Sequence, residues 1–316
     1  DATITAEQTG VYFQDQIKFD RLVLTLGGRY DVARQSGPTR TLATGALAIQ
    51  NVPADAFTGR ASLLYLFDNG IAPYVSYSEA FEPIATGRIF DTTFGTVGRI
   101  PDPVSSNQYE AGIKYQPPGT DILLTAAAFD IRRSNATQPD PNNQGFVVQT
   151  GEVGVQGIEF EARANINENL TLIGGFSILD IKNTRDITNT TNDLTGQPVP
   201  LLGRSPVLVP DSTASLFADY RFTDGPLLGL QVGGGVRYLG PSWGDPANTF
   251  KVPESVLVDA VASYDLKYLD ATLQGFQVQL NAQNLLDERY VTGCFSYSGC
   301  YYGLPRTVYA TLRYRW

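Results

Sequence analysis

The sequence predicts an all-β protein, the antiparallel wall of a transmembrane β-barrel with about 13–14 strands. Three observations predict this fold. Apolar and polar residues alternate with the period of two that a β-strand requires. Short turns alternate with long polar segments along the chain. The chain has no uninterrupted apolar run as long as a helical membrane span needs.

The C-terminal segment shows the clearest alternation. One face of this segment carries Val308, Ala310, Leu312, Tyr314 and Trp316, and the other carries Thr307, Tyr309, Thr311, Arg313 and Arg315. An arginine at the lipid midplane costs roughly 2–4 kcal/mol, so the apolar face is expected to meet lipid and the arginine face to line a polar lumen. The strand is expected to end at Trp316 on the side of the short turns.

The same alternation recurs along the chain. Strands are expected near 8–20, 21–33, 56–67, 71–82, 105–116, 120–133, 150–166, 169–183, 208–222, 227–240, 252–267, 274–284 and 305–316. Two of them are irregular: Asp15 interrupts the apolar face of the first strand, and the apolar face of 121–133 is ambiguous. An odd number of antiparallel strands does not close on itself, so either one strand is missed or the chain forms part of a larger wall.

The connections fall into two classes. Short turns contain typical turn residues, such as Asp68-Asn69-Gly70 and Pro117-Pro118-Gly119. Long polar segments are expected at about 34–55, 83–104, 134–149, 184–206, 241–251 and 287–304. Because the two kinds of connection alternate, the short turns are expected at one end of the barrel and the long segments at the other. This asymmetry is typical of outer-membrane barrels. No shift in composition marks a second domain, so residues 1–316 are expected to form a single barrel domain.

Composition excludes several functions. The net charge of -9 argues against nucleic-acid binding, which requires a basic surface to neutralise phosphates. The chain has no His and 2 Cys, so a transition-metal site with nitrogen and sulfur ligands is not expected. A Ser-His-Asp catalytic arrangement is impossible without His. We therefore expect no catalytic residue, no bound metal and no cofactor.

Several segments are similar to a known family. They are TGVYFQDQIKF and LTLGGRYD within 9–31, YLFDNGIAPYVSYSEAFEP at 65–83, YEAGIKYQPPG at 109–119, QTGEVGVQGIEFEA at 149–162, GDPANTFKVP at 244–253 and NLLDERYVTGCFSYSGCYYG at 284–303. They occur in order over almost the whole chain. The chain resembles the C-terminal barrel portion of TonB-dependent ferric-siderophore receptors, most closely the ferrichrome and hydroxamate-siderophore group.

The resemblance implies a location, a substrate and partners. It implies a 22-stranded barrel in the bacterial outer membrane, an N-terminal plug inside that barrel, import of a ferric siderophore, and energy supplied through TonB. The iron complex is then a substrate rather than a cofactor, and outer-membrane lipid surrounds the wall. The chain has room for little more than half of such a barrel, and we expect neither the plug nor the TonB-box segment within residues 1–316.

The last long loop contains both cysteines and four aromatic residues. Cys294 and Cys300 are expected to form a disulfide, with a redox or metal role as the alternative. The resemblance places Phe295 where the family has an aromatic contact to the iron-siderophore complex. Further candidates for substrate binding are Tyr297, Tyr301, Tyr302 and, in an earlier loop, Trp243. Their rings suit a bulky, partly apolar chelate. The alternative is packing inside a loop, which is evenly weighted for Phe295 and favoured for the tyrosines and Trp243.

The sequence is consistent with three classes of function. The leading hypothesis is a binding and transport protein for ferric siderophores. The alternative is a passive pore without a plug, either natural or engineered. A remote third is an enzyme built on an outer-membrane barrel. Charged residues on the lumen face are expected either to pair with a plug or to form ion pairs along the wall: Glu159, Glu161, Arg163, Asp219, Arg221, Arg237, Arg313 and Arg315.

Overall fold

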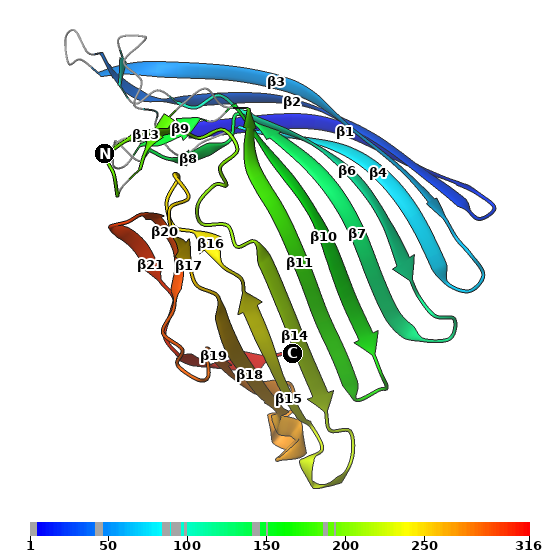
Figure 1. Ribbon diagram of the computed structural model, residues 1–316. Coiled ribbons are helices and arrows are strands. Elements are labelled where there is room, and N and C mark those ends of the chain that lie inside the picture. The colour runs from blue at the N-terminus through cyan, green and yellow to red at the C-terminus, as the bar shows by residue number, and fades with distance from the viewer. Residues whose placement is uncertain are drawn as a thin grey trace.

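The computed structural model describes residues 5–41, 47–83, 89, 96–97, 100–140, 146–149, 151–185, 189–192 and 194–316. One antiparallel sheet of 14 strands dominates it (Figure 1). Along the sheet the strands are β1 (Thr5–Phe19), β2 (Leu22–Thr41), β3 (Leu47–Tyr65), β4 (Ile71–Glu82), β6 (Val104–Tyr115), β7 (Asp121–Ser134), β10 (Glu152–Asn165), β11 (Leu170–Arg185), β14 (Ser212–Arg221), β15 (Leu230–Leu239), β18 (Ser255–Asp265), β19 (Phe276–Gln283) and β22 (Thr307–Tyr314). The short β5 (Thr96–Val97) pairs with β2 outside this path.

Each wall strand pairs with the wall strand that follows it in the chain, which gives a simple up-and-down order. The sheet curves into a trough in Figure 1. Among the described residues no pairing joins β1 to β22, so both of these strands are edges. The prediction of an all-β, antiparallel wall with about thirteen or fourteen strands is confirmed.

The strand register places the predicted apolar residues on one continuous face. Phe160 lies opposite Phe176, and Leu216 lies opposite Val236. On β18 the side chain of Val256 is 52% exposed, whereas its neighbour Leu257, on the other face, is 1% exposed. The polar face is therefore the crowded, inner face of the trough, and the apolar face points outward.

The register also resolves the ambiguous strand β7. Ala126 and Ala128 pair with Phe160 and Ile158, so they face outward, and Phe129 faces inward. The ring of Phe129 occupies the space above Gly157, where an added Cβ would lie 2.7 Å from the ring carbon Cζ. Alanine outside and phenylalanine inside give both faces of β7 apolar residues, so its own alternation could not identify the outer face. Asp15 lies opposite Leu26 on the outer face of edge strand β1, as the sequence predicts.

Aromatic rings gather at both margins of the apolar face. At the short-turn end Tyr65 packs against Phe67 with ring centroids 4.7 Å apart, and Phe276 packs against Tyr314 at 4.5 Å. Toward the long-loop end Tyr77 and Tyr109 lie 4.9 Å apart. Bands of aromatic residues at the two interfaces are typical of membrane barrels.

One long polar segment differs from its prediction. Most of residues 34–55 belong to β2 and β3, whose pairing continues from Leu22 opposite Tyr65 to Arg40 opposite Leu47. The backbone hydrogen bonds of a hairpin do not require apolar side chains, so polar residues extend the strands beyond the apolar band. Much of the predicted segment 83–104, and parts of 134–149 and 184–206, lie outside the described residues.

The short turns contain the helical segments of the described chain. These are the 3-10 turns η1 (Gly225–Leu227), η2 (Leu266–Tyr268) and η3 (Ala271–Leu273). None of the described helices is long and apolar enough to cross a membrane. At the opposite end of the wall are four small two-stranded sheets: β8 (Thr137–Pro139) with β9 (Val147–Gln149), β12 (Asn189–Thr191) with β13 (Pro198–Pro200), β16 (Ser242–Trp243) with β17 (Lys251–Val252), and β20 (Val291–Ser296) with β21 (Gly299–Tyr302) (Figure 1).

Candidate functional site

Three loops meet at the long-loop end of β14, β15, β18 and β19. They are the segments 204–211, 240–252 and 285–304, and we call them together the loop assembly. Pro210 forms a β-bridge with Ser242, which joins the first two segments. Leu208 lies directly over Gly293, where an added Cβ would be 2.6 Å from Leu208 Cδ2. The first segment therefore contacts both of the others.

The loop that carries Trp243 is organised by a buried carboxylate. Asp245 is 0% exposed. Its Oδ1 accepts a hydrogen bond from the backbone N–H of Thr249 at 2.6 Å, and its Oδ2 lies 2.8 Å from the Thr249 hydroxyl. The side chain of Asn248 donates to Ser205 O at 2.9 Å and accepts from Ser205 N at 2.8 Å. These bonds fold the 244–250 loop and hold it against segment 204–211.

A single asparagine fixes the base of the last loop. Asn284 is 3% exposed and adopts a left-handed backbone conformation, with a φ of 50°. Its side-chain nitrogen donates to Glu288 O at 2.8 Å and to Leu304 O at 3.1 Å, and its side-chain oxygen accepts from Glu288 N at 2.8 Å. Its own N–H donates to Asp259 Oδ1 on β18 at 2.9 Å. Asn284 thus joins both ends of the loop to the wall.

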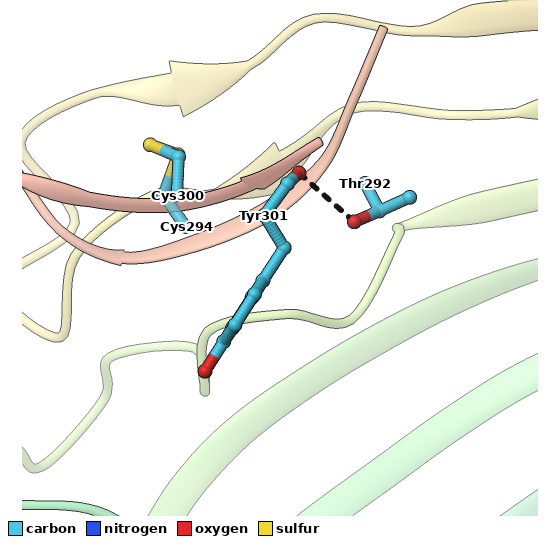
Figure 2. Close-up of a disulfide and its surroundings, with 4 residues drawn as sticks. All are labelled: Thr292, Cys294, Cys300 and Tyr301. Atoms are coloured by element: carbon cyan, nitrogen blue, oxygen red, sulfur yellow. Dashed lines mark hydrogen bonds between the residues drawn. A yellow bond between two sulfur atoms is a disulfide. The ribbon is translucent and has the colours of Figure 1, made fainter. Parts of the chain in front are cut away.

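The two cysteines close the tip of the β20–β21 hairpin (Figure 2). Cys294 and Cys300 are direct cross-strand partners with Cα atoms 4.0 Å apart, and their sulfur atoms are bonded at 2.00 Å. The predicted disulfide is confirmed. Figure 2 shows the ring of Tyr301 on the side of the hairpin away from the disulfide, with Thr292 Oγ1 donating to Tyr301 O at 3.0 Å.

Phe295 packs within the hairpin itself. Its ring covers Gly299, where an added Cβ would lie 2.3 Å from the Phe295 Cζ atom. Its ring centroid is 5.7 Å from that of Tyr301. The side chain is half-buried rather than enclosed, so one ring face supports the hairpin while part of the ring stays accessible. The packing role of Phe295 is therefore visible, and a contact to a ligand stays a prediction.

Phe250 connects Tyr297 to the loop that carries Trp243. Tyr297 meets Phe250 edge-to-face, with centroids 5.8 Å apart and planes at 82°. Phe250 in turn covers Gly244, next to Trp243. The ammonium of Lys251 lies 5.0 Å from the Trp243 ring centroid and 3.2 Å from Asp211 Oδ2.

Phe250 was not predicted as a site residue. The GDPANTF motif at 244–250 was the available signal, because it directly follows Trp243 and ends at Phe250. Leu208 carried no loop signal, because it falls at the start of the expected strand 208–222, whereas β14 begins at Ser212 and Leu208 lies in the preceding loop with a positive φ.

Three tyrosines leave the loop assembly with a large aromatic surface. Tyr297, Tyr301 and Tyr302 are 65%, 57% and 82% exposed. Exposed rings held on a cross-linked hairpin offer apolar contact area at low cost in conformational entropy, together with hydroxyl groups for hydrogen bonds. Such a surface suits binding of a bulky organic ligand. Among the described residues no group of three His, Cys, Asp or Glu side chains is placed to hold a metal ion.

The inner wall below the loops carries ion pairs, and of the eight lumen-facing charges named from the sequence Arg237 is the one that forms such a pair among the described residues. Arg237 Nε lies 2.5 Å from Asp259 Oδ2, and Asp259 also receives the Asn284 N–H. Arg29 and Asp31 form a similar pair at 2.6 Å on β2. The loop assembly is therefore connected, through Asn284, to a charged network on the inner face.

The sequence model of the family described as TonB dependent receptor-like, beta-barrel, matches residues 1–285. The chain belongs to the TonB-dependent receptor β-barrel family. Members of this family are receptors and transporters rather than enzymes, in agreement with the prediction of no enzymatic activity. The resemblance inferred from the sequence is confirmed.

Two curated relatives match this TonB-dependent receptor barrel over 98% of its length. The ferrichrome outer membrane transporter/phage receptor of Escherichia coli K12 is 40% identical, and the match covers 38% of that protein. The ferrioxamine receptor of Yersinia enterocolitica is also 40% identical, and the match covers 40% of it. The chain thus spans about two-fifths of the length of these relatives.

Solved structures show the same fold. The siderophore receptor PiuA of Acinetobacter baumannii superposes with a TM-score of 0.74 at 25% identity, over 98% of this chain and 43% of PiuA. The ferric preacinetobactin receptor BauA of the same organism gives a TM-score of 0.67 at 26% identity, over 98% and 42%. In both cases the barrel of this family aligns with part of a longer receptor.

Proposed function

We propose that this chain forms part of the wall of an outer-membrane receptor that imports a ferric siderophore, of the hydroxamate type. The observation that carries the proposal is the 40% identity, over 98% of the chain, to a ferrichrome transporter and to a ferrioxamine receptor. Residues 1–316 are the barrel portion, and import is driven through TonB by way of parts of the receptor outside these residues.

The loop assembly is the proposed contact surface for the iron-siderophore complex. The β16 strand and the β20–β21 hairpin lie at the long-loop end of the wall (Figure 1). They carry the aromatic residues proposed for this contact: Trp243, Phe295, Tyr297, Tyr301 and Tyr302. Iron stays enclosed by its organic chelator, so the protein contacts the chelator rather than the metal. Aromatic and polar groups together are suited to such a partly apolar ligand.

Iron-limited growth tests this function. The complete gene product that contains this chain is expressed in a strain that lacks its own hydroxamate-siderophore receptors but retains TonB. We expect growth on ferrichrome or ferrioxamine B, no growth on a ferric catecholate, and no growth on either when TonB is deleted. Growth that is independent of the expressed receptor, or uptake that persists without TonB, contradicts the proposal.

Planar-bilayer conductance separates a receptor from a passive pore. A receptor with its lumen filled gives a closed channel, whereas an unplugged barrel of this kind gives a persistent large current. We expect the complete gene product to be closed. A stable open current from that protein, combined with no siderophore binding, would favour the pore.

A further inference from the structure

The first segment of the loop assembly, residues 204–211, is bonded to the wall strand β11 at both of its ends. At one end the backbone carbonyl of Arg204 accepts from the Asn183 N–H at 2.8 Å and from the Asn183 side-chain nitrogen at 3.0 Å. At the other end the carbonyl of Asp211 accepts from the Leu179 N–H at 2.8 Å. Asn183 is 1% exposed, so the first attachment is buried. Segment 204–211 therefore has a fixed place relative to the wall.

The loop at 240–252 is attached to this segment at its base and at its tip. At the base the Asp211 N–H donates to Pro241 O at 3.0 Å. At the tip the guanidinium of Arg204 donates from Nη1 to Ala247 O at 2.6 Å. The base is thus held by a backbone bond, whereas a long charged side chain holds the tip.

Folding of the tip and placement of the tip depend on different bonds. The turn at the tip is closed from within, because Asp245 Oδ1 accepts from the Thr249 N–H at 2.6 Å. The bonds to segment 204–211 come from outside the turn, namely the Arg204 bond and the pair of bonds between Asn248 and Ser205. Loss of the Arg204 side chain is therefore expected to release the turn without unfolding it.

The Arg204 bond has a buried acceptor. Ala247 is 1% exposed, so its carbonyl loses its donor without gaining easy access to water when the guanidinium is removed. A charged donor also makes a stronger hydrogen bond than a neutral one. Arg306 offers a contrast, because its Nη1 donates at 3.3 Å to the carbonyl of Leu285, a residue that is 38% exposed.

The turn that Arg204 holds is continuous with the aromatic part of the loop assembly. Trp243 directly precedes the turn, and Phe250 ends it. The ring of Phe250 meets that of Tyr297 on the β20–β21 hairpin, with centroids 5.8 Å apart. Groups that bind a ligand together need to be held within about 0.5 Å of the productive geometry. A shift of the turn therefore changes the surface that the ligand meets.

We propose that Arg204 is a positioning residue for ligand binding, which holds the turn at 244–250 so that Trp243 and Phe250 keep a fixed place relative to the β20–β21 hairpin. The inference rests on the proposed function, because the ligand is the ferric siderophore of that proposal. Arg204 acts through the loop and does not itself contact the ligand.

Hydrogen exchange of two single amides tests the placement without any ligand. The protein is the complete gene product that contains this chain, in detergent, and mass spectrometry with electron-transfer fragmentation resolves the amides. The Ser205 N–H donates to Asn248 between the two segments, whereas the Thr249 N–H donates to Asp245 within the turn. Arg204→Met keeps an unbranched side chain and removes every donor. In this variant we expect the Ser205 N–H to exchange about tenfold faster and the Thr249 N–H to stay within about twofold of the unchanged protein.

Siderophore affinity tests the consequence for binding. By isothermal titration with ferrichrome and ferrioxamine B, Arg204→Met is expected to weaken binding by about tenfold, as loss of one charge-assisted hydrogen bond would. Arg204→Lys retains a charged donor without the planar fork, so a loss of only about threefold is expected. Arg306→Met is the matched control, because it removes a guanidinium bond to an exposed backbone carbonyl, and it should leave the affinity unchanged.

A double-mutant cycle with Trp243→Leu separates positioning from direct contact. If Arg204 acts through the loop that carries Trp243, the loss of affinity in the double variant is smaller than the product of the two single losses. A loss equal to that product means that Arg204 acts independently of Trp243, and it overturns the proposal.

Three further outcomes overturn the proposal. Unchanged exchange of the Ser205 N–H means that Arg204 does not hold the turn. Equal acceleration of the Thr249 N–H means that Arg204 stabilises the fold of the turn rather than its placement. Faster exchange of Ser205 alone, with unchanged siderophore affinity, means that the placement does not serve binding. Absence of siderophore binding by the unchanged protein contradicts the proposed function instead, and the exchange rates then decide separately whether Arg204 holds the turn.

Discussion

Asn284 shows how one side chain determines the geometry of a functional loop. It satisfies the backbone groups of Glu288 and Leu304 while its own backbone lies in the left-handed region, which asparagine tolerates better than most residues. Its burial means that the groups it contacts have no easy access to water when its side chain is lost. Two substitutions separate these contributions.

Replacing Asn284 by Gly removes the hydrogen bonds and keeps the backbone conformation accessible. We expect local opening of the 285–304 loop to become easier by about 2–3 kcal/mol, from three lost bonds of about 1 kcal/mol each. Asn284→Ala adds about 1–2 kcal/mol of strain from its Cβ in the left-handed region. Limited proteolysis of the loop measures the opening, and cleavage should be fastest for alanine. Equal cleavage rates in all three proteins would mean that other contacts hold the loop.

Phe295 allows the packing role and the ligand role to be separated. Phe295→Ala should weaken binding of the ferric siderophore by about 1–2 kcal/mol, because a large aromatic contact is lost. Phe295→Leu keeps apolar cover over Gly299 but no aromatic face, so it should restore the hairpin's resistance to protease without restoring affinity. Isothermal titration on the intact receptor measures the affinity. If affinity follows protease resistance in both variants, Phe295 acts through packing alone.

At the scale of elements, the β20–β21 hairpin depends on its cross-link. The ring closed by Cys294 and Cys300 is small, and the loop-entropy model assigns it roughly 2 kcal/mol. Reduction, or Cys294→Ser with Cys300→Ser, is expected to loosen the hairpin and to lower siderophore affinity. The wall strands should keep their stability, because the hairpin is a separate two-stranded sheet. Heat-induced unfolding in detergent and binding measured side by side test this. A large loss of wall stability contradicts the prediction.

The strands and the loop assembly differ in how far the sequence predicts them. A period of two is local information, so the thirteen wall strands can be located from their own residues. The contact of Leu208 with Gly293 joins positions 85 residues apart in the sequence (293 minus 208), and no pattern in either segment specifies it. The disulfide was predictable because only two cysteines exist. The bonds that join Asn248 to Ser205 were not, because both residues also suit an exposed loop.

At the scale of the whole molecule, the two faces of the wall should respond differently to the same charge. Phe176 faces outward opposite Phe160, and Ser177 faces inward opposite Glu159. Phe176→Arg is expected to destabilise the protein by about 2–4 kcal/mol in a bilayer, because the arginine meets hydrocarbon. Ser177→Arg should cost little, because the new charge lies near a carboxylate in a polar lumen. Unfolding by guanidinium in lipid vesicles measures both. Similar losses for the two neighbours would contradict the assigned faces.

The sequence alone determined the strand count, the turn asymmetry and the outward face of most strands. Each strand's own residues show the alternation, and the cost of placing arginine in lipid identifies the face that points away from the bilayer. It also determined the family, through ordered matching segments. The tertiary structure decided the features that depend on contacts between segments distant in the sequence. The outer face of β7 follows from pairing with β10, since alanine and phenylalanine make both of its faces apolar. The contacts of Leu208 with Gly293 and of Asn248 with Ser205 formed only when the strands brought their loops together, because a contact is set by distance in space and not by position in the chain.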